Sequence, residues 1–168
     1  MSDFEIEPQY EFISTSEAET ARLGQSVGHA LVPGLVIGLN GTLGSGKTRL
    51  TQAIGASLGI PEGEVVSPTF TICVPHEGRV PFLHLDAYRI GQPEEVDELG
   101  LDELAEDGVV LIIEWAELIK NLLPDLDVEI WIVPTGTETR QFCFQANSDR
   151  GRKLVLALTT LLDSDPQN

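Results

Sequence analysis

The segment at residues 41–48, GTLGSGKT, constrains the fold of this chain more than any other feature. It matches the phosphate-binding pattern G-x-x-x-x-G-K-[ST] at every specified position. Glycines adopt the positive-φ backbone conformations that turn successive N–H groups inward around an anion. The apolar run at residues 35–40 precedes this segment, and Leu50, Ile54 and Leu58 mark one face of a helix after it. A buried strand, a glycine-rich loop and an amphipathic helix in this order predict a nucleotide phosphate site.

Two side chains of this loop carry specific chemistry. Lys47 supplies a positive charge to the β- and γ-phosphate oxygens, and the hydroxyl of Thr48 can ligate Mg²⁺. The backbone N–H groups of Gly44, Ser45 and Gly46 are predicted to surround the phosphates. The dinucleotide pattern G-x-G-x-x-G is absent from this region, and the chain has no guanine-selecting N-K-x-D segment. The loop therefore predicts that the cofactors are ATP and Mg²⁺.

A phosphate loop needs a carboxylate at the end of a nearby strand, because Mg²⁺ must be held. Glu114 follows the apolar residues of a strand predicted at 109–115, which favours a metal-binding role over an ordinary polar strand end. Asp86 closes a second strand, predicted at 80–88. Its carboxylate can contact the metal through water, or position or deprotonate a nucleophile. The alternative for Asp86 is an ion pair with Arg89 at the edge of the sheet.

The other polar side chains near these strands are less specific. His84 lies between apolar residues, a pattern typical of a hydrogen-bonded core histidine, and Tyr88 is interpreted as a packing residue. Ser67 and Thr69 belong to the segment SPTF at residues 67–70. This segment is either a switch that touches the γ-phosphate or Mg²⁺, or an ordinary turn that contains proline.

Strand and helix patterns alternate along most of the chain. Helices are predicted from Ser16 to Pro33, after the glycine-rich loop, at 116–123 and at 149–162, with two short acidic helical turns within 93–104. Strands at 128–133 and 140–145 form an antiparallel hairpin. The pattern predicts a three-layer α/β sandwich of the P-loop NTPase type with a mixed β-sheet. The chain, residues 1–168, is predicted to be one P-loop ATPase domain.

The charge of the chain limits its direct partners. Ten Lys and Arg face 27 Asp and Glu, a formal net charge of −17, which argues against a nucleic-acid backbone as the main ligand. The chain has no apolar run of membrane-spanning length and no signal-peptide pattern at its start, so we expect a cytoplasmic protein without a membrane partner. Cys73 and Cys143 lie in apolar runs and are predicted to be core residues rather than a disulfide pair.

Several motifs in order resemble the bacterial TsaE family of small P-loop ATPases. They are STSEAET at 14–20, the glycine-rich loop, SPTF, HLDAYR at 84–89 followed by PEEVDELG, IEW at 113–115 and LLPDLDVEI at 122–130. This family is required to make threonylcarbamoyladenosine beside the anticodon of tRNA. The resemblance implies a partner-dependent ATPase, slow alone, that acts on TsaD-like and TsaB-like transferase subunits. It implies contact with tRNA only through that complex.

The resemblance also implies roles for individual residues. Lys47 and Thr48 take the phosphate and Mg²⁺ roles, Glu114 contacts Mg²⁺, Asp86 is the acid essential to hydrolysis, and Glu17 lies near the nucleotide. Together the motif and the resemblance predict metal contacts for Thr48 and Glu114 and catalytic roles for Asp86 and Lys47. The predicted nucleotide contacts are Glu17, Gly44, Ser45, Gly46, Lys47, Thr48, Arg49, Ser67 and Thr69.

Two residues depart from the family pattern. Thr42 stands where the family usually has Asp, and Ala116 where it usually has Pro. Because Thr42 precedes the phosphate-binding glycines, nucleotide binding is expected to remain. Ala116 is expected to change only how the next helix begins.

Two other functions fit the glycine-rich loop. A small nucleoside or sugar kinase would use Asp86 as its base, but the acidic stretch at 93–104 has no arginine to serve as a phosphate lid. A nucleotide-dependent interaction module without hydrolysis would not need Asp86 and Glu114. An arginine that stabilises transferred phosphate could be Arg49, Arg89 or Arg140, or could come from a partner.

Overall fold

A seven-stranded sheet forms the middle layer of the molecule, in the order β1-β7-β6-β2-β5-β4-β3. The structure is a computed structural model that describes residues 9–61, 63–67 and 71–164. The strands are β1 (Tyr10–Ser14), β2 (Val36–Asn40), β3 (Cys73–His76), β4 (Phe82–Asp86), β5 (Val110–Glu114), β6 (Val128–Pro134) and β7 (Arg140–Ala146). Strands β6, β2, β5 and β4 are parallel, whereas β1, β7 and β3 each pair antiparallel with a neighbour. The predicted mixed sheet is confirmed.

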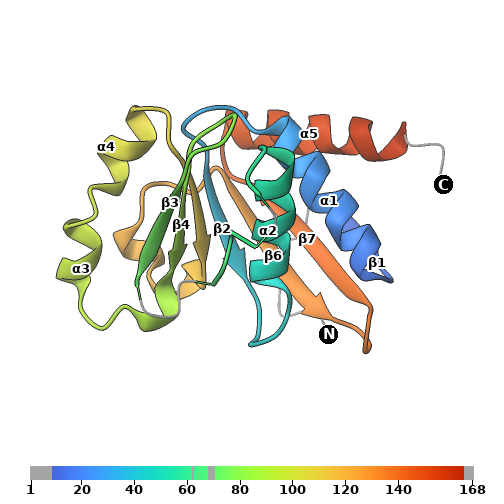
Figure 1. Cartoon of the computed structure of the whole chain (residues 1–168), viewed down its shortest axis with the longest axis horizontal. Helices are drawn as coiled ribbons and strands as arrows, with labels where there is room; N and C mark the ends of the chain where they lie inside the picture. Colours follow the sequence, from blue (N-terminus) through green and yellow to red (C-terminus); the bar gives the residue numbers. More distant parts are fainter. Residues whose placement is uncertain (1–8, 62, 68–70, 165–168) are drawn as a thin grey trace.

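Helices cover both faces of the sheet. They are α1 (Glu17–Ala30), α2 (Lys47–Ser57), α3 (Pro93–Asp97), α4 (Leu101–Glu106) and α5 (Asp149–Asp163), with 3-10 turns η1 (Ala87–Arg89), η2 (Ala116–Leu118) and η3 (Lys120–Leu122). Helices α1, α2 and α5 share one apolar cluster with the sheet, and α3, α4 and η2 share a second cluster on the other face. Figure 1 shows α1 and α2 in front of the sheet and α3 and α4 at the left. The three-layer α/β architecture is confirmed.

Strand β1 is not among the predicted elements. It pairs antiparallel with β7 along its whole length at the edge of the sheet. Tyr10 and Phe12 turn toward the core and alternate with the exposed Glu11 and Ile13. This period of two is the signal of a half-buried strand, but it extends over only five residues.

The predicted helix at 116–123 is wrong, because this segment forms the 3-10 turns η2 and η3. Trp115, immediately before η2, has a left-handed backbone with φ of 60°. The buried side chains of Ala116 and Ile119 lie three residues apart, which fits the three residues per turn of a 3-10 helix. The strand predicted at 80–88 is also shorter, since its last residues form η1.

The topology brings the polar ends of three strands together. Parallel strands β2, β5 and β4 are neighbours, so their carboxyl ends meet at one edge of the sheet. Glu114 at the end of β5 lies opposite Leu39 of β2 on one side and Asp86 of β4 on the other. The chain after β2 enters the glycine-rich loop at the same edge. Ligands of open α/β sheets bind at this position.

Helix α1 packs closely against α2, which follows the glycine-rich loop. Ser16 caps α1, and its hydroxyl accepts a hydrogen bond from the N–H of Glu19 at 3.2 Å. A Cβ atom at Gly24 of α1 would lie only 2.3 Å from the Cβ atom of Ala53 of α2. The absence of a side chain at Gly24 therefore lets the two helices approach.

We expect Gly24→Ala to lower the free energy of unfolding by about 1–3 kcal/mol, because the added methyl group overpacks the α1–α2 contact. Urea unfolding measures this change. Ala53→Gly removes the opposing methyl group, so the double variant should lose less stability than the sum of the two single variants, by about 0.5–3 kcal/mol. Additive losses would contradict this contact between α1 and α2.

Candidate functional site

The glycine-rich loop at residues 41–48 joins the end of β2 to the first turn of α2. Gly44 and Gly46 have φ of 75° and 113°, conformations that side chains disfavour. Gly46 is the N-cap of the 11-residue helix α2, whose first N–H groups and positive dipole end point toward the loop. This arrangement is suited to hold the phosphates of a nucleotide.

The ammonium group of Lys47 lies at the base of this loop. Nζ donates hydrogen bonds to the carbonyl oxygens of Gly41 at 2.7 Å and Thr42 at 3.0 Å, and lies 3.8 Å from the ring centroid of Trp115. Burial lowers the pKa of Lys47, although nearby carboxylates oppose this shift. No ion pair between described residues includes Lys47. An anionic phosphate would therefore supply the direct ion pair that this buried ammonium group does not have among the described residues.

Thr42 contributes to this contact through its backbone. Its carbonyl oxygen accepts from Lys47, and its side chain is exposed. The exchange of the family's usual Asp for Thr therefore leaves the Lys47 contact intact.

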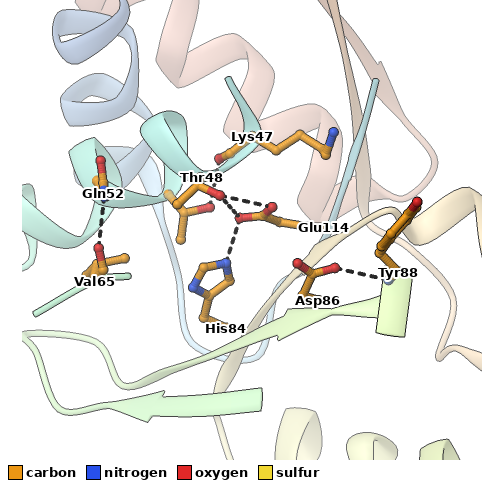
Figure 2. A network of polar contacts seen from close by, with 9 residues as sticks. Lys47, Thr48, Gln52, Val65, His84, Asp86, Tyr88 and Glu114 are labelled. Carbon is orange, nitrogen blue, oxygen red and sulfur yellow. Dashed lines mark hydrogen bonds and ion pairs between the residues drawn. The ribbon is translucent and has the colours of Figure 1, made fainter. Parts of the chain in front are cut away.

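Thr48 and Glu114 form a pair of hard oxygen donors beside the loop. The hydroxyl Oγ1 of Thr48 donates to Glu114, with distances of 2.9 Å to Oε1 and 3.1 Å to Oε2 (Figure 2). Within residues 9–61, 63–67 and 71–164 there is no group of three or more His, Cys, Asp or Glu that could hold a metal ion. Mg²⁺ bound with a nucleotide needs only one or two protein oxygens, because phosphate and water complete its octahedron. The Thr48–Glu114 pair fits that requirement.

Asp86 lies next to Glu114 across the β4–β5 pair and is almost fully buried. Its Oδ1 accepts a hydrogen bond from the N–H of Tyr88 at 3.0 Å. Burial raises the pKa of Asp86, and the neighbouring Glu114 acts in the same direction. The ion pairs of the described residues do not include Asp86 with Arg89, whose side chain is exposed. The structure thus leaves the Asp86 carboxylate at the site without the predicted alternative partner.

His84 takes the structural position that the sequence favours, whereas Tyr88 is 62% exposed and packs on one side only. His84 is completely buried, and its Nε2 lies 2.7 Å from Oε1 of Glu114. The prediction of a hydrogen-bonded core histidine is confirmed, with Glu114 as its partner. The ring of Tyr88 packs against the ring of Trp115, with centroids 5.0 Å apart.

A cavity of about 320 Å³ adjoins Gly46 on the side of α1. Its lining residues are Ser16, Glu17, Thr20, Gly46, Arg49, Thr137, Glu138 and Arg140. Glu17 and Arg49 form an ion pair at 3.3 Å across it, so both predicted contacts lie beside the loop. Nε of Arg140 donates to the carbonyl oxygen of Ser45 at 3.0 Å. The cavity is adjacent to the phosphate loop and is large enough for part of a nucleoside.

The residues of the β6–β7 hairpin that line this cavity are not among the predicted nucleotide contacts. Thr137 and Glu138 come from the β6–β7 connection, and Arg140 is the first residue of β7, 95 residues after Ser45. The sequence suggests Arg140 only as one of several arginines that could stabilise transferred phosphate. The sequence contains no local signal for its contact with Ser45, because strand order brings the two together.

Glu117 is a second residue that the sequence patterns do not single out. Its backbone N–H donates to Oδ1 of the buried Asn40 at 3.1 Å. Burial raises the pKa of the Glu117 carboxyl, and the nearby Lys47 opposes this shift. The one feature of the sequence that could have identified Glu117 is its position three residues after Glu114.

The segment SPTF is described only at its first residue. Ser67 is half-buried, whereas Thr69 lies outside the described residues. The side-chain amide of Gln52 on α2 donates to the carbonyl oxygen of Val65 at 3.0 Å (Figure 2), which attaches the chain just before Ser67 to α2. A switch role for Ser67 and Thr69 stays a prediction.

The two cysteines are not joined by a disulfide bond. Cys143 is buried, Cys73 is half-buried, and both are free thiols. None of the helices in the described ranges is long and apolar enough to cross a membrane.

Comparisons with known proteins agree with the motifs. Residues 14–142 match a family model described as "Threonylcarbamoyl adenosine biosynthesis protein TsaE". The chain is 36% identical over 152 residues to the "tRNA threonylcarbamoyladenosine biosynthesis protein TsaE" of Bacillus subtilis, covering 90% of this chain and 94% of that protein. The protein of the same name from Treponema pallidum is 38% identical over 118 residues, 70% of this chain and 87% of that one.

A solved structure shares the fold as well. The crystal structure of YdiB from Bacillus subtilis superposes with a TM-score of 0.77 at 30% sequence identity, covering 94% of this chain and 98% of that chain. The match of the family model over most of the chain, with these relatives, shows that the chain belongs to the TsaE family.

Proposed function

We propose that this protein binds ATP with Mg²⁺ and hydrolyses it during the synthesis of threonylcarbamoyladenosine on tRNA, in response to a TsaB–TsaD-type complex. The observation that carries the ATPase part is the contact of Thr48 with Glu114 beside the buried Lys47. A phosphate loop, a hydroxyl and a strand-end carboxylate in contact are the parts that phosphoryl-transfer sites of this kind share. Family membership supports the role in tRNA modification.

Each residue has a separate task in this proposal. The loop N–H groups and Lys47 bind the phosphates, and the cavity beside Gly46 receives the nucleoside. Thr48 and Glu114 would hold Mg²⁺, which neutralises charge on the phosphates. Asp86 orients the attacking water and accepts its proton, a task that suits a carboxylate whose pKa burial has raised.

The acidic surface supports action on a protein complex. A formal charge of −17 opposes direct binding to the tRNA backbone, so the partner proteins would provide the basic surface. ATP binding and hydrolysis would then reset the partner complex between rounds of modification.

Calorimetric titration with ATP, combined with an assay for released phosphate, tests the ATPase part. We expect ATP to bind more tightly with Mg²⁺ than without it, and EDTA to stop phosphate release. The labelled γ-phosphate should appear as inorganic phosphate. Lack of ATP binding would reject the proposal, and transfer of the label to a nucleoside or sugar would indicate a kinase instead.

A further inference from the structure

His84 is a completely buried polar side chain with a defined partner at the metal site. It projects from β4 toward α2, on the same face of the strand as Asp86 (Figure 2). Its Nε2 lies 2.7 Å from Oε1 of Glu114, while its Nδ1 has no hydrogen-bonding partner among the described residues. Among the described residues, Glu114 is therefore the one hydrogen-bonding partner of this imidazole ring.

The charge of the Glu114 carboxylate determines which ring nitrogen of His84 carries hydrogen. An ionised carboxylate only accepts hydrogen bonds, so the nitrogen that contacts it must be the donor. The hydroxyl of Thr48 also donates to Glu114. With Glu114 ionised, as a metal ligand must be, Nε2 of His84 is the nitrogen that carries hydrogen and donates it to Oε1.

The two oxygens of Glu114 are not equivalent in this arrangement. Oε1 contacts His84 at 2.7 Å and Thr48 at 2.9 Å, whereas Oε2 has only the longer Thr48 contact of 3.1 Å among the described residues. Oε2 thus keeps more of its lone-pair capacity for a cation. The short bond from a rigid, buried ring also restricts rotation of the Glu114 carboxylate.

We propose that His84 is a positioning residue for the metal site: it donates to Oε1 of Glu114 and thereby presents Oε2 to Mg²⁺ beside Thr48. The inference rests on the Mg²⁺–ATP part of the proposed function and extends it to a residue that does not touch the nucleotide. Hydrogen bonds of this kind to metal-ligating carboxylates typically change metal affinity by about 10–100-fold.

Metal binding can be measured directly, without turnover. Mn²⁺ replaces Mg²⁺ as a paramagnetic probe, and electron paramagnetic resonance gives its affinity in the presence of a non-hydrolysable ATP analogue. We expect His84→Met, which removes the donor and fills the space with a flexible apolar side chain, to weaken Mn²⁺ binding by about 10–100-fold. Binding of the analogue without metal should stay within about twofold of wild type.

Two variants separate the hydrogen bond from core packing. His84→Gln places an amide donor where Nε2 lies, so it should recover most of the Mn²⁺ affinity that His84→Met loses. Phe82 lies two residues earlier on the same strand and is buried in the apolar cluster that α1, α2 and α5 share with the sheet, and its side chain has no polar atom to contact Glu114. Phe82→Leu should therefore lower the melting temperature while Mn²⁺ affinity stays at the wild-type value.

The wild-type protein gives an answer that does not depend on the folding of a variant. The ¹⁵N chemical shifts of the His84 ring distinguish a protonated Nε2 from a bare one. The inference requires hydrogen on Nε2; a ring with hydrogen on Nδ1 alone would overturn it. Equal Mn²⁺ affinities of wild type and His84→Met, or equal weakening by His84→Gln and His84→Met, would also overturn it. Failure of the wild type to bind Mn²⁺ with the analogue would instead reject the proposed function.

Discussion

Replacing Lys47 with alanine is expected to weaken ATP binding by at least about 30-fold. Lys47 is almost fully buried, and its ammonium group donates only to uncharged oxygens among the described residues, namely the carbonyls of Gly41 and Thr42 and the hydroxyl of Ser45. A bound phosphate would therefore be its first directly paired anion. Truncating one member of a buried, hydrogen-bonded charge pair costs about 2–5 kcal/mol, which corresponds to roughly 30-fold to several-thousand-fold in affinity. Isothermal titration with ATP and Mg²⁺ measures this loss.

Lys153 provides the matched control for that substitution. It is a lysine on the exposed face of α5, and Lys153→Ala removes the same charge from the chain without touching the loop. We expect Lys153→Ala to bind ATP as wild type does. If Lys47→Ala bound ATP with wild-type affinity, the glycine-rich loop would not be the phosphate site.

Asp86→Asn is expected to lower kcat for ATP hydrolysis by about 10²–10⁴-fold, the usual contribution of a general base. Asparagine keeps the shape of the side chain and can still accept from Tyr88, but it cannot accept a proton from water. ATP affinity should change little, because the loop and Lys47 are untouched. Steady-state hydrolysis and calorimetric binding, measured on the same preparation, separate the two effects.

Two further substitutions determine whether the effect belongs to Asp86. Asp102→Asn removes an exposed carboxylate of α4 and should leave kcat unchanged. Glu114→Gln should act differently from Asp86→Asn, since it weakens the metal contact and so raises the Mg²⁺ concentration needed for half-maximal rate. A wild-type kcat for Asp86→Asn would remove this carboxylate from the mechanism.

The part of the site within the glycine-rich loop could be predicted because its chemistry is local. The glycines, Lys47 and Thr48 all lie within the segment 41–48, which runs directly into the first turn of α2. The apolar runs that became β2 and β5 are continuous because both faces of a central parallel strand are buried. The carboxyl ends of such strands meet at one edge, and there the structure has Glu114 and Asp86 side by side.

The remainder of the site depends on contacts between distant segments. Arg140 reaches Ser45 only because β7 lies beyond β6 in the sheet, and His84 meets Glu114 only because β4 is next to β5. No period or motif in the sequence encodes that order. The wrong prediction of a helix after Trp115 has a local cause instead. The segment contains helix-forming residues, but the left-handed backbone of Trp115 and the three-residue spacing of the buried Ala116 and Ile119 favour a 3-10 turn.

ATP turnover by the wild-type chain, alone and with a TsaB–TsaD-type complex, tests the central claim most directly. The proposed function predicts slow hydrolysis alone and faster hydrolysis with the complex, and Asp86→Asn should abolish that increase. Equal rates with and without the complex, in a preparation shown to bind Mg²⁺–ATP, would contradict a partner-dependent ATPase.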